Sequence, residues 1–146
     1  MKEIRSVVLS AYASTIFVGG GEDSDYSSPV MAALRFDAKM SLVCEQDLNM
    51  VGKSMVYCMK SFEQSNLLFA GLFGAVAIVY FTMNRFEVIS LIDDIVADEV
   101  CCLKYIDNSI YFVCPTVPEI IRVSFPKLSM DNRRKSVVGG FDVGFI

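Results

Sequence analysis

The 146-residue chain contains no histidine and no tryptophan. Without imidazole it cannot form a Ser-His-Asp triad, use histidine as a general base or bind a metal through histidine. Positive charge is also scarce, because 17 Asp and Glu outnumber 13 Lys and Arg and leave a net charge of −4. Nucleic-acid binding depends on Lys and Arg gathered over phosphates. These absences exclude imidazole-dependent enzyme mechanisms, and we expect no nucleic-acid partner.

Charged residues make up only 21% of the chain, whereas 53% of its residues are hydrophobic. A chain of this length corresponds to about one domain, and a compact fold of this size buries roughly 70% of the surface of the unfolded chain. The composition supplies enough apolar side chains for such a core. We therefore expect one folded domain, or part of one, and not a disordered chain.

Five cysteines are an odd number, and their spacing matches neither a disulfide framework nor a zinc site. They are Cys44, Cys58, Cys101, Cys102 and Cys114. Several lie inside apolar runs such as residues 100–103 and 111–114, as small reduced core residues do. Residues 1–6 carry charge early and lack the apolar core of a signal peptide. We expect free thiols and a cytoplasmic location.

Residues 64–84 contain no charged side chain, and residues 67–83 are almost wholly apolar. By hydropathy alone this segment could span a membrane. Gly71, Gly74 and several β-branched or aromatic residues instead fit two short buried strands joined by a glycine turn. We favour the two strands, because the segment also belongs to a repeat, and keep a small membrane protein spanning at 67–83 as the alternative.

A strand-like segment that ends in phenylalanine occurs three times, and the phenylalanines are 45 and then 44 residues apart. The three segments are residues 32–36, 77–81 and 121–125. Each follows another apolar segment, namely residues 16–19, 68–71 and 111–114. A further segment lies upstream of each pair (7–11, 55–59, 100–104) and another downstream (42–44, 86–89, 127–130). The repeating unit is therefore four short strands connected as hairpins.

Four antiparallel strands every 40 to 50 residues are typical of a β-propeller blade. We predict an all-β fold of about three four-stranded blades at residues 4–50, 51–97 and 98–130. Residues 131–146 would form a C-terminal basic and glycine-containing tail or an extra strand. Closed rings need about four to eight blades. The chain is then a partial ring within a longer polypeptide, or a ring completed by self-association or by a partner. A compact sandwich or an α+β domain is the alternative fold.

Across residues 4–130 the repeated architecture resembles the WD-repeat family, although the Trp-Asp dipeptide and the Gly-His start of that family are missing. The resemblance implies a non-enzymatic scaffold that holds other proteins through its inter-strand loops. We find no hydroxyl or thiol nucleophile with an activating partner. The acidic pairs Asp93-Asp94 and Asp98-Glu99 flank the connection between the second and third units, where we expect them to be surface charges. We predict no enzyme chemistry.

The connection from Gly19 to Pro29 lengthens the first unit, and inserted loops often carry function. Its glycines could present free backbone groups to a ligand or cation, and its acids could add carboxylate oxygens. The candidate partner-binding residues are Gly19, Gly20, Gly21, Glu22, Asp23 and Asp25. The plainer interpretation, which we favour, is a solvated hairpin loop, because the spacing matches neither an EF-hand loop nor a phosphate-binding loop.

The run Gly19–Glu22, with Leu34-Arg35-Phe36-Asp37 beginning twelve positions after Glu22, resembles the first blade of a narrower family. These are the propeller exchange factors of the endoplasmic reticulum that activate the small GTPase of the COPII coat. The resemblance implies that Gly19, Gly20, Gly21 and Glu22 hold a potassium ion and that the loop pushes against the GTPase. It also implies a place on the cytosolic face of the endoplasmic reticulum. Ser27-Ser28-Pro29 stands where the family usually has an asparagine, and no C-terminal membrane anchor is evident. Otherwise we expect no cofactor.

Ser136 follows Arg133-Arg134-Lys135 and precedes a valine, which is the pattern that basophilic kinases recognise. A phosphate on Ser136 would offset the local positive charge. The alternative interpretation is a solvated basic linker. Taken together, the sequence favours an interaction scaffold of propeller blades over nucleotide exchange on a vesicle-budding GTPase and over a membrane protein.

Overall fold

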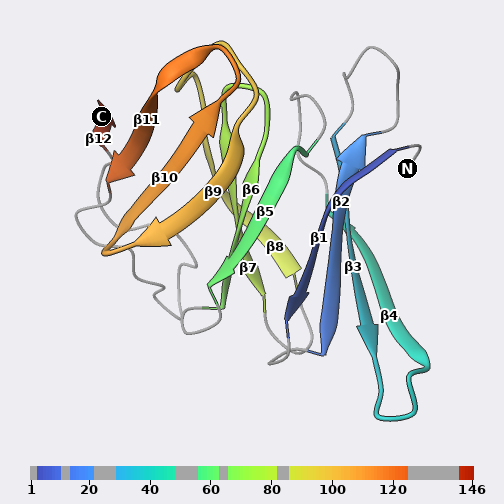
Figure 1. Cartoon of the computed structure of the whole chain (residues 1–146). Helices are drawn as coiled ribbons and strands as arrows, with labels where there is room; N and C mark the ends of the chain where they lie inside the picture. The colour runs from blue at the N-terminus through green and yellow to red at the C-terminus, as the bar shows by residue number, and fades with distance from the viewer. Residues whose placement is uncertain are drawn as a thin grey trace.

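The computed structural model describes residues 3–10, 14–21, 29–48, 56–62, 66–81, 86–124 and 142–146. These residues form three four-stranded antiparallel sheets and no helix (Figure 1). The first sheet contains β1 (Glu3–Ser10), β2 (Thr15–Gly21), β3 (Pro29–Phe36) and β4 (Leu42–Leu48). The second contains β5 (Cys58–Phe62), β6 (Leu67–Gly71), β7 (Val76–Phe81) and β8 (Phe86–Ile92). The third contains β9 (Cys101–Ile106), β10 (Ser109–Cys114), β11 (Val117–Ser124) and β12 (Asp142–Phe145). The predicted all-β class is confirmed.

Within each sheet every strand pairs with the next strand along the chain. The turn before the second strand of each sheet ends in a residue with a left-handed backbone: Ser14 (φ 46°), Asn66 (φ 54°) and Asn108 (φ 58°). Asparagine tolerates this conformation better than most residues, because its short polar side chain bonds locally. Phe36 and Phe81 donate their backbone N–H groups to the Ser14 and Asn66 carbonyl oxygens at 3.1 and 2.9 Å. The first two sheets therefore share one hairpin geometry.

The fourth strand of the third sheet is not where the repeat places it. The repeat predicts residues 127–130, which lie outside the described residues. In the structure β12 occupies this position, and its Val143 pairs with Val123 of β11. The third sheet therefore includes a strand from residues 131–146, the segment for which the sequence predicts a tail or an extra strand.

The apolar segment 67–83 contains β6 and β7, which pair as a hairpin. All side chains of β6 are buried, and those of β7 are buried except Tyr80. Gly74, with φ 69°, lies in the turn between them, as the glycine-turn interpretation predicts. Among the described residues, no helix has the length and hydrophobicity that crossing a membrane requires.

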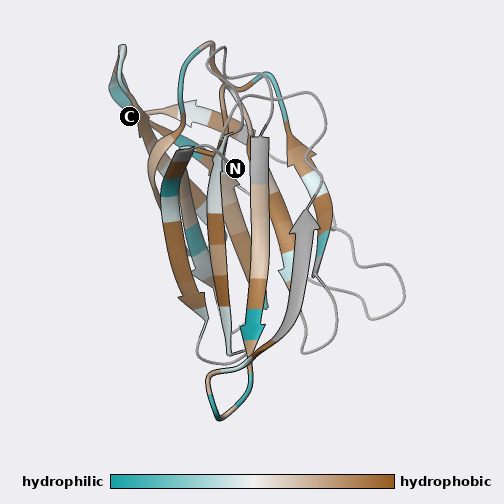
Figure 2. Cartoon of the chain, turned by 90° about the vertical axis from the view of Figure 1, so that its right-hand side faces the viewer, coloured by the Kyte–Doolittle hydropathy of each residue, from teal (hydrophilic) through white to brown (hydrophobic). Residues whose placement is uncertain are grey.

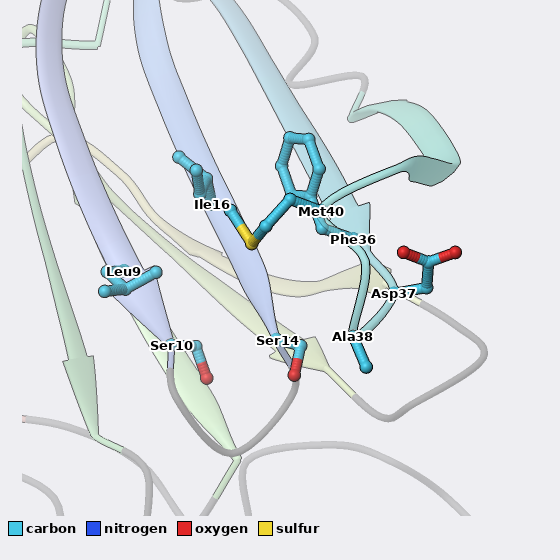
Figure 3. Close-up of a pocket in the computed structure, with 8 residues that line it drawn as sticks. All are labelled: Leu9, Ser10, Ser14, Ile16, Phe36, Asp37, Ala38 and Met40. Atoms are coloured by element: carbon cyan, nitrogen blue, oxygen red, sulfur yellow. The ribbon is translucent and has the colours of Figure 1, made fainter.

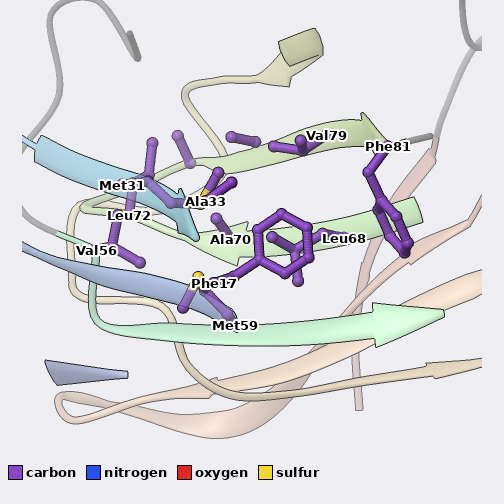
Figure 4. Close-up of a cluster of buried hydrophobic side chains, with 12 residues drawn as sticks. Phe17, Met31, Ala33, Val56, Met59, Leu68, Ala70, Leu72, Val79 and Phe81 are labelled. Atoms are coloured by element: carbon purple, nitrogen blue, oxygen red, sulfur yellow. The ribbon is translucent and has the colours of Figure 1, made fainter. Parts of the chain in front are cut away.

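The three sheets pack face to face in series, with the second sheet between the other two (Figure 1). The alternation of side chains along β6 divides its residues between two cores. Leu68 and Ala70 face the first sheet, whereas Leu67 and Phe69 face the third sheet. The core between the first and second sheets is completed by Phe17, Met31, Ala33, Val56, Met59, Leu72, Ala75, Ala77, Val79 and Phe81 (Figure 4). A sheet covered on both faces explains why residues 67–81 are apolar throughout.

Aromatic contacts join the sheets. Phe17 and Phe81 pack in a tilted arrangement between the first and second sheets, with ring centroids 5.3 Å apart. Phe69 stacks on Tyr105 between the second and third sheets, with centroids 5.2 Å apart. Each contact therefore joins an aromatic ring of a second strand, β2 or β6, to the following sheet.

The connections between sheets follow a common plan. Val56, which precedes β5, donates its backbone N–H to the Gly20 carbonyl oxygen at 2.9 Å. Val100, which precedes β9, donates in the same way to Leu72 at 3.0 Å. Both valine side chains are fully buried. Each connection is thereby fixed to the end of the second strand of the sheet that it leaves.

Candidate protein-interaction surface

The three glycines predicted to open a partner-binding loop lie in a strand instead. Gly19, Gly20 and Gly21 are the last residues of β2, where they pair with β1 on one side and β3 on the other. Gly20 also accepts the hydrogen bond from Val56. The predicted start of the loop at Gly19 is therefore wrong, because these peptide groups belong to a central strand. The connection begins after Gly21.

The other predicted site residues, Glu22, Asp23, Asp25 and Ser136, lie outside the described residues. Within the described part of the chain, no cluster of three or more Cys, Asp or Glu side chains is arranged to bind a metal ion. The cation site and the phosphorylation site stay predictions.

Of the acidic pairs between the second and third sheets, Asp93 and Asp94 are exposed as expected, but Asp98 is not. Asp98 is 8% exposed, and its Oδ2 atom accepts hydrogen bonds from the Thr116 hydroxyl at 2.6 Å and from the Thr116 N–H at 2.8 Å. These bonds, led by the one from the hydroxyl, lower the pKa of the Asp98 carboxyl. Asp98 is a structural clamp, because it ties the connection before β9 to the turn between β10 and β11.

Cys58, Cys101, Cys102 and Cys114 are free thiols, as predicted. Burial raises the pKa of Cys58 to about 11 and that of Cys114 to about 11, and it also raises the pKa of Cys101. The Cys58 thiol donates to the Val100 carbonyl oxygen at 3.3 Å. These three thiols are therefore protonated at neutral pH and are poor nucleophiles. Cys102 is exposed, on an irregular part of β9 with φ 50°.

Among the described residues, an extended exposed apolar surface lies on the side of the first sheet that faces away from the second. Figure 2 looks toward this side of the molecule, and hydrophobic residues run along its strands. Val7 is 59% exposed and Leu9 67% exposed on β1. The surface continues over β2 and β3, and we call it the outer face of the first sheet. It consists of Val7, Leu9, Ile16, Val18, Ala32, Leu34 and Phe36.

One end of this outer face is hollowed into a groove of about 420 Å³ (Figure 3). Leu9, Ile16 and Phe36 line it, and the exposed side chain of Met40 lies over it. Met40 belongs to the turn between β3 and β4, where Asp37 accepts hydrogen bonds from the backbone N–H groups of Lys39 and Ser41, both at 2.9 Å. The turn is thus held so that Met40 borders the groove. Apolar lining of this kind suits a hydrophobic side chain of a partner.

The outer face of the first sheet is equivalent in register to the face of the second sheet that packs against the first sheet. Registers measured from Ser14 and Asn66 place Ile16, Val18, Leu34 and Phe36 at the positions of Leu68, Ala70, Val79 and Phe81. All four residues of the second sheet are fully buried. The same pattern is therefore covered in one sheet and uncovered in the other.

In the part of the chain that the structure describes, one side of the third sheet is also uncovered, and we call it the outer face of the third sheet. It comprises Cys102, Lys104, Tyr111, Val113, Ile120 and Arg122. Tyr111 and Val113 line a shallow hollow of about 160 Å³. Exposed Lys104 and Arg122 make this face more polar than the outer face of the first sheet.

Sequence reasoning missed both outer faces, although residues 7–9 and 16–18 are apolar at every position and so place hydrophobic side chains on both sides of their strands. It also aligned Phe112 with Phe17 and Phe69, whereas the registers measured from Ser14, Asn66 and Asn108 align Tyr111 with them. A shift of one residue exchanges the two sides of a strand. No protein-family model matches the chain, and neither does any curated protein.

Proposed function

We propose that the chain is a non-enzymatic protein-interaction scaffold built on three WD-repeat-like propeller blades. A partner protein chain covers the outer face of the first sheet. The blade interpretation is supported by three four-stranded antiparallel sheets stacked in series, and by contacts of β1 with β5 and of β5 with β9. Propeller blades are likewise four-stranded sheets arranged next to one another around a central channel.

One observation carries this proposal: the exposed outer face repeats a buried one. Val7 is 59% exposed, yet Met59, at the equivalent register position of the second sheet, is 8% exposed. Large contiguous apolar patches are uncommon on proteins that act alone and are typical of interaction sites. The groove beside Met40 adds a place for an anchoring side chain.

Nucleotide exchange on a vesicle-budding GTPase, with its place at the endoplasmic reticulum, stays a prediction from sequence resemblance. Three of the residues on which this resemblance rests, Gly19, Gly20 and Gly21, lie in β2 and pair with β1 and β3. This geometry gives the alternative no added support.

The test is capture by cross-linking, with the purified chain as bait, followed by identification of the bound protein and binding measurements with that protein in purified form. Leu9→Lys should abolish binding, because it places a charge on the apolar groove. Ala97→Lys is the matched control, since Ala97 is exposed in the connection before β9. Equal binding by Leu9→Lys and the wild-type chain would contradict the proposal. A second copy of the chain counts as a bound protein.

A further inference from the structure

We infer that the partner on the outer face of the first sheet is the outer face of the third sheet of a second copy. Two copies then close a ring of six sheets, joined by two identical contacts. This inference rests on the proposal that the sheets are propeller blades. It goes beyond that proposal by naming the partner and the residues that meet.

The first argument is continuity with the packing inside the chain. The second sheet packs on the first through Leu68, Ala70 and Val79, which face Phe17, Met31 and Ala33 (Figure 4). The outer face of the first sheet is equivalent to the Leu68 side of the second sheet. It should therefore pack against a face that is equivalent to the Phe17 side of the first sheet. In the described part of the chain, the third sheet has such a face uncovered.

The second argument is an aromatic pair. Phe17 and Phe81 meet between the first and second sheets at 5.3 Å. Tyr111 is the third-sheet equivalent of Phe17, and Phe36 is the first-sheet equivalent of Phe81. Both are partly exposed. In the ring, Tyr111 of one copy packs against Phe36 of the other, beside the groove that Phe36 lines.

The third argument concerns the valine of each connection. Val56 packs against Gly19, and Val100 packs against Gly71. In the proposed contact, Ile4, which precedes the regular part of β1, takes the position of the valine, and Val113 takes the position of the glycine. Ile4 is 63% exposed and Val113 39% exposed. In the ring, Ile4 of one copy and Val113 of the other form an aliphatic pair at the position where a connecting valine is buried inside the chain.

The fourth argument is area. Four strands spaced about 4.8 Å apart and about 20 Å long give each outer face a footprint of roughly 400 Å². A closed pair buries four such faces, or roughly 1,600 Å², which is the usual size of a stable interface. A single contact between two first sheets would bury about half of this area, close to the range of crystal-packing contacts. Closure also leaves neither outer face uncovered.

The polar groups of the third sheet fit this arrangement. Lys104 and Arg122 carry long aliphatic stems, which can cover apolar surface while their charged ends reach solvent at the rim. These cations lie on only one of the two faces that meet. A contact between a first sheet and a third sheet therefore removes fewer cations from water than a contact between two third sheets would.

The test is size-exclusion chromatography with light scattering on the full chain and on three variants. The wild-type chain should elute with twice the mass of one chain. Val7→Lys, on the first sheet, and Ile120→Lys, on the third, should each reduce the mass to that of one chain. Ala97→Lys, which adds the same charge away from both faces, should remain a dimer. Circular dichroism on each variant confirms that the β-sheet spectrum is kept.

The other outcomes overturn the inference. A monomeric wild-type chain, or a dimer that survives both lysine variants, excludes this contact. A dimer lost in Val7→Lys but kept in Ile120→Lys indicates contact between two first sheets. Assemblies larger than two copies indicate a contact that does not close. In each of these cases the capture experiment still decides separately whether the first sheet binds another protein.

Discussion

Gly71 and Val100 are packed so closely that a Cβ atom on Gly71 would lie 2.7 Å from the Val100 carbonyl oxygen. Gly71 ends β6, and Val100 lies in the connection to the next sheet. The first sheet has the same relationship, since a Cβ atom on Gly19 would lie 2.7 Å from Cγ1 of Val56. Glycine at this position is therefore what allows the valine of each connection to be buried against the sheet that it leaves.

Gly71→Ala should lower the free energy of unfolding by about 1–3 kcal/mol, because overpacking against a backbone oxygen cannot be relieved by a side-chain rotation. Gly19→Ala should cost less, since Val56 can shift. Gly144→Ala is the control, because a Cβ atom there meets no atom within 4 Å. Urea denaturation measures all three variants. Equal stability of Gly71→Ala and Gly144→Ala would show that the contact is not tight.

Gly19→Ala should be partly rescued by Val56→Ala, which removes the Cγ1 atom that the new methyl group meets. Val56→Ala alone destabilises the chain by leaving a cavity between the sheets. The double variant should therefore be more stable than the sum of the two single effects predicts. Additive effects would mean that Gly19 and Val56 do not compete for the same space.

The clamp between Asp98 and Thr116 should make stability depend on acid pH. The pKa of Asp98 is lower in the folded chain, so its ionised carboxylate stabilises the fold above the unfolded-state value of about 3.9. That stabilisation is lost as the pH falls through the folded-state pKa. The Tm difference between the wild-type chain and Asp98→Asn should be largest at neutral pH and shrink below about pH 4.

Asp107→Asn is the matched control for this acid dependence, since Asp107 is exposed in the turn between β9 and β10. Thermal unfolding at several pH values compares the three proteins. A Tm difference between wild type and Asp98→Asn that does not change with pH would show that the effect of Asn is steric and not due to charge.

Thiol labelling should separate Cys102 from the buried cysteines. At neutral pH, Cys58 and Cys114 remain protonated because burial raises the pKa of each to about 11. Iodoacetamide should label them only after unfolding. Cys102 is exposed in one copy but lies on the outer face of the third sheet, so it should react several-fold faster in Val7→Lys than in the wild-type dimer.

Peptide mass spectrometry resolves the site of labelling, and Cys102→Ser should remove the fast reaction. Equal Cys102 labelling in the wild-type chain and in Val7→Lys would argue against the ring. Fast labelling of Cys58 in the folded chain would instead show that the core between the second and third sheets opens.

The repeat made the sheets predictable. Phe36 and Phe81 end the third strands β3 and β7, whereas Phe125 lies outside the described residues, directly after Ser124 of β11. The predicted segments before them overlap β1–β3, β5–β7 and β9–β11, although the segment 55–59 begins and ends three residues earlier than β5. The apolar composition from Leu67 to Phe81 was also informative, since strands of a sheet covered on both faces carry hydrophobic side chains on both sides. The fourth strand of the third unit was misplaced, because a long connection separates β11 from β12 and periodicity does not report such an insertion.

The candidate site was less predictable. Three consecutive glycines after Val18 suggest a loop by composition, yet pairing on both sides keeps Gly19–Gly21 in β2. Tertiary pairing overrides local preference here. Asp98 was expected at the surface because charged residues usually are, and only the position of Thr116, 18 residues away, explains its burial. Exposure of Val7 and Leu9 depends on which sheets are neighbours, which a strand pattern does not specify.

The aromatic pair Phe17–Phe81 should stabilise the fold of one chain, whereas the pair Phe36–Tyr111 should stabilise the contact between two copies. Phe17 and Phe81 lie within one chain, so a double-mutant cycle with leucine at both positions should give a coupling of about 0.5–1.5 kcal/mol in the free energy of unfolding. Phe36 and Tyr111 meet only between copies in the proposed ring. Their leucine cycle should show no coupling in the unfolding of the monomeric Val7→Lys background, but a coupling of similar size, about 0.5–1.5 kcal/mol per contact, in dimer dissociation measured by sedimentation. Coupling between Phe36 and Tyr111 in the monomer, or its absence from dissociation, would contradict the proposed contact.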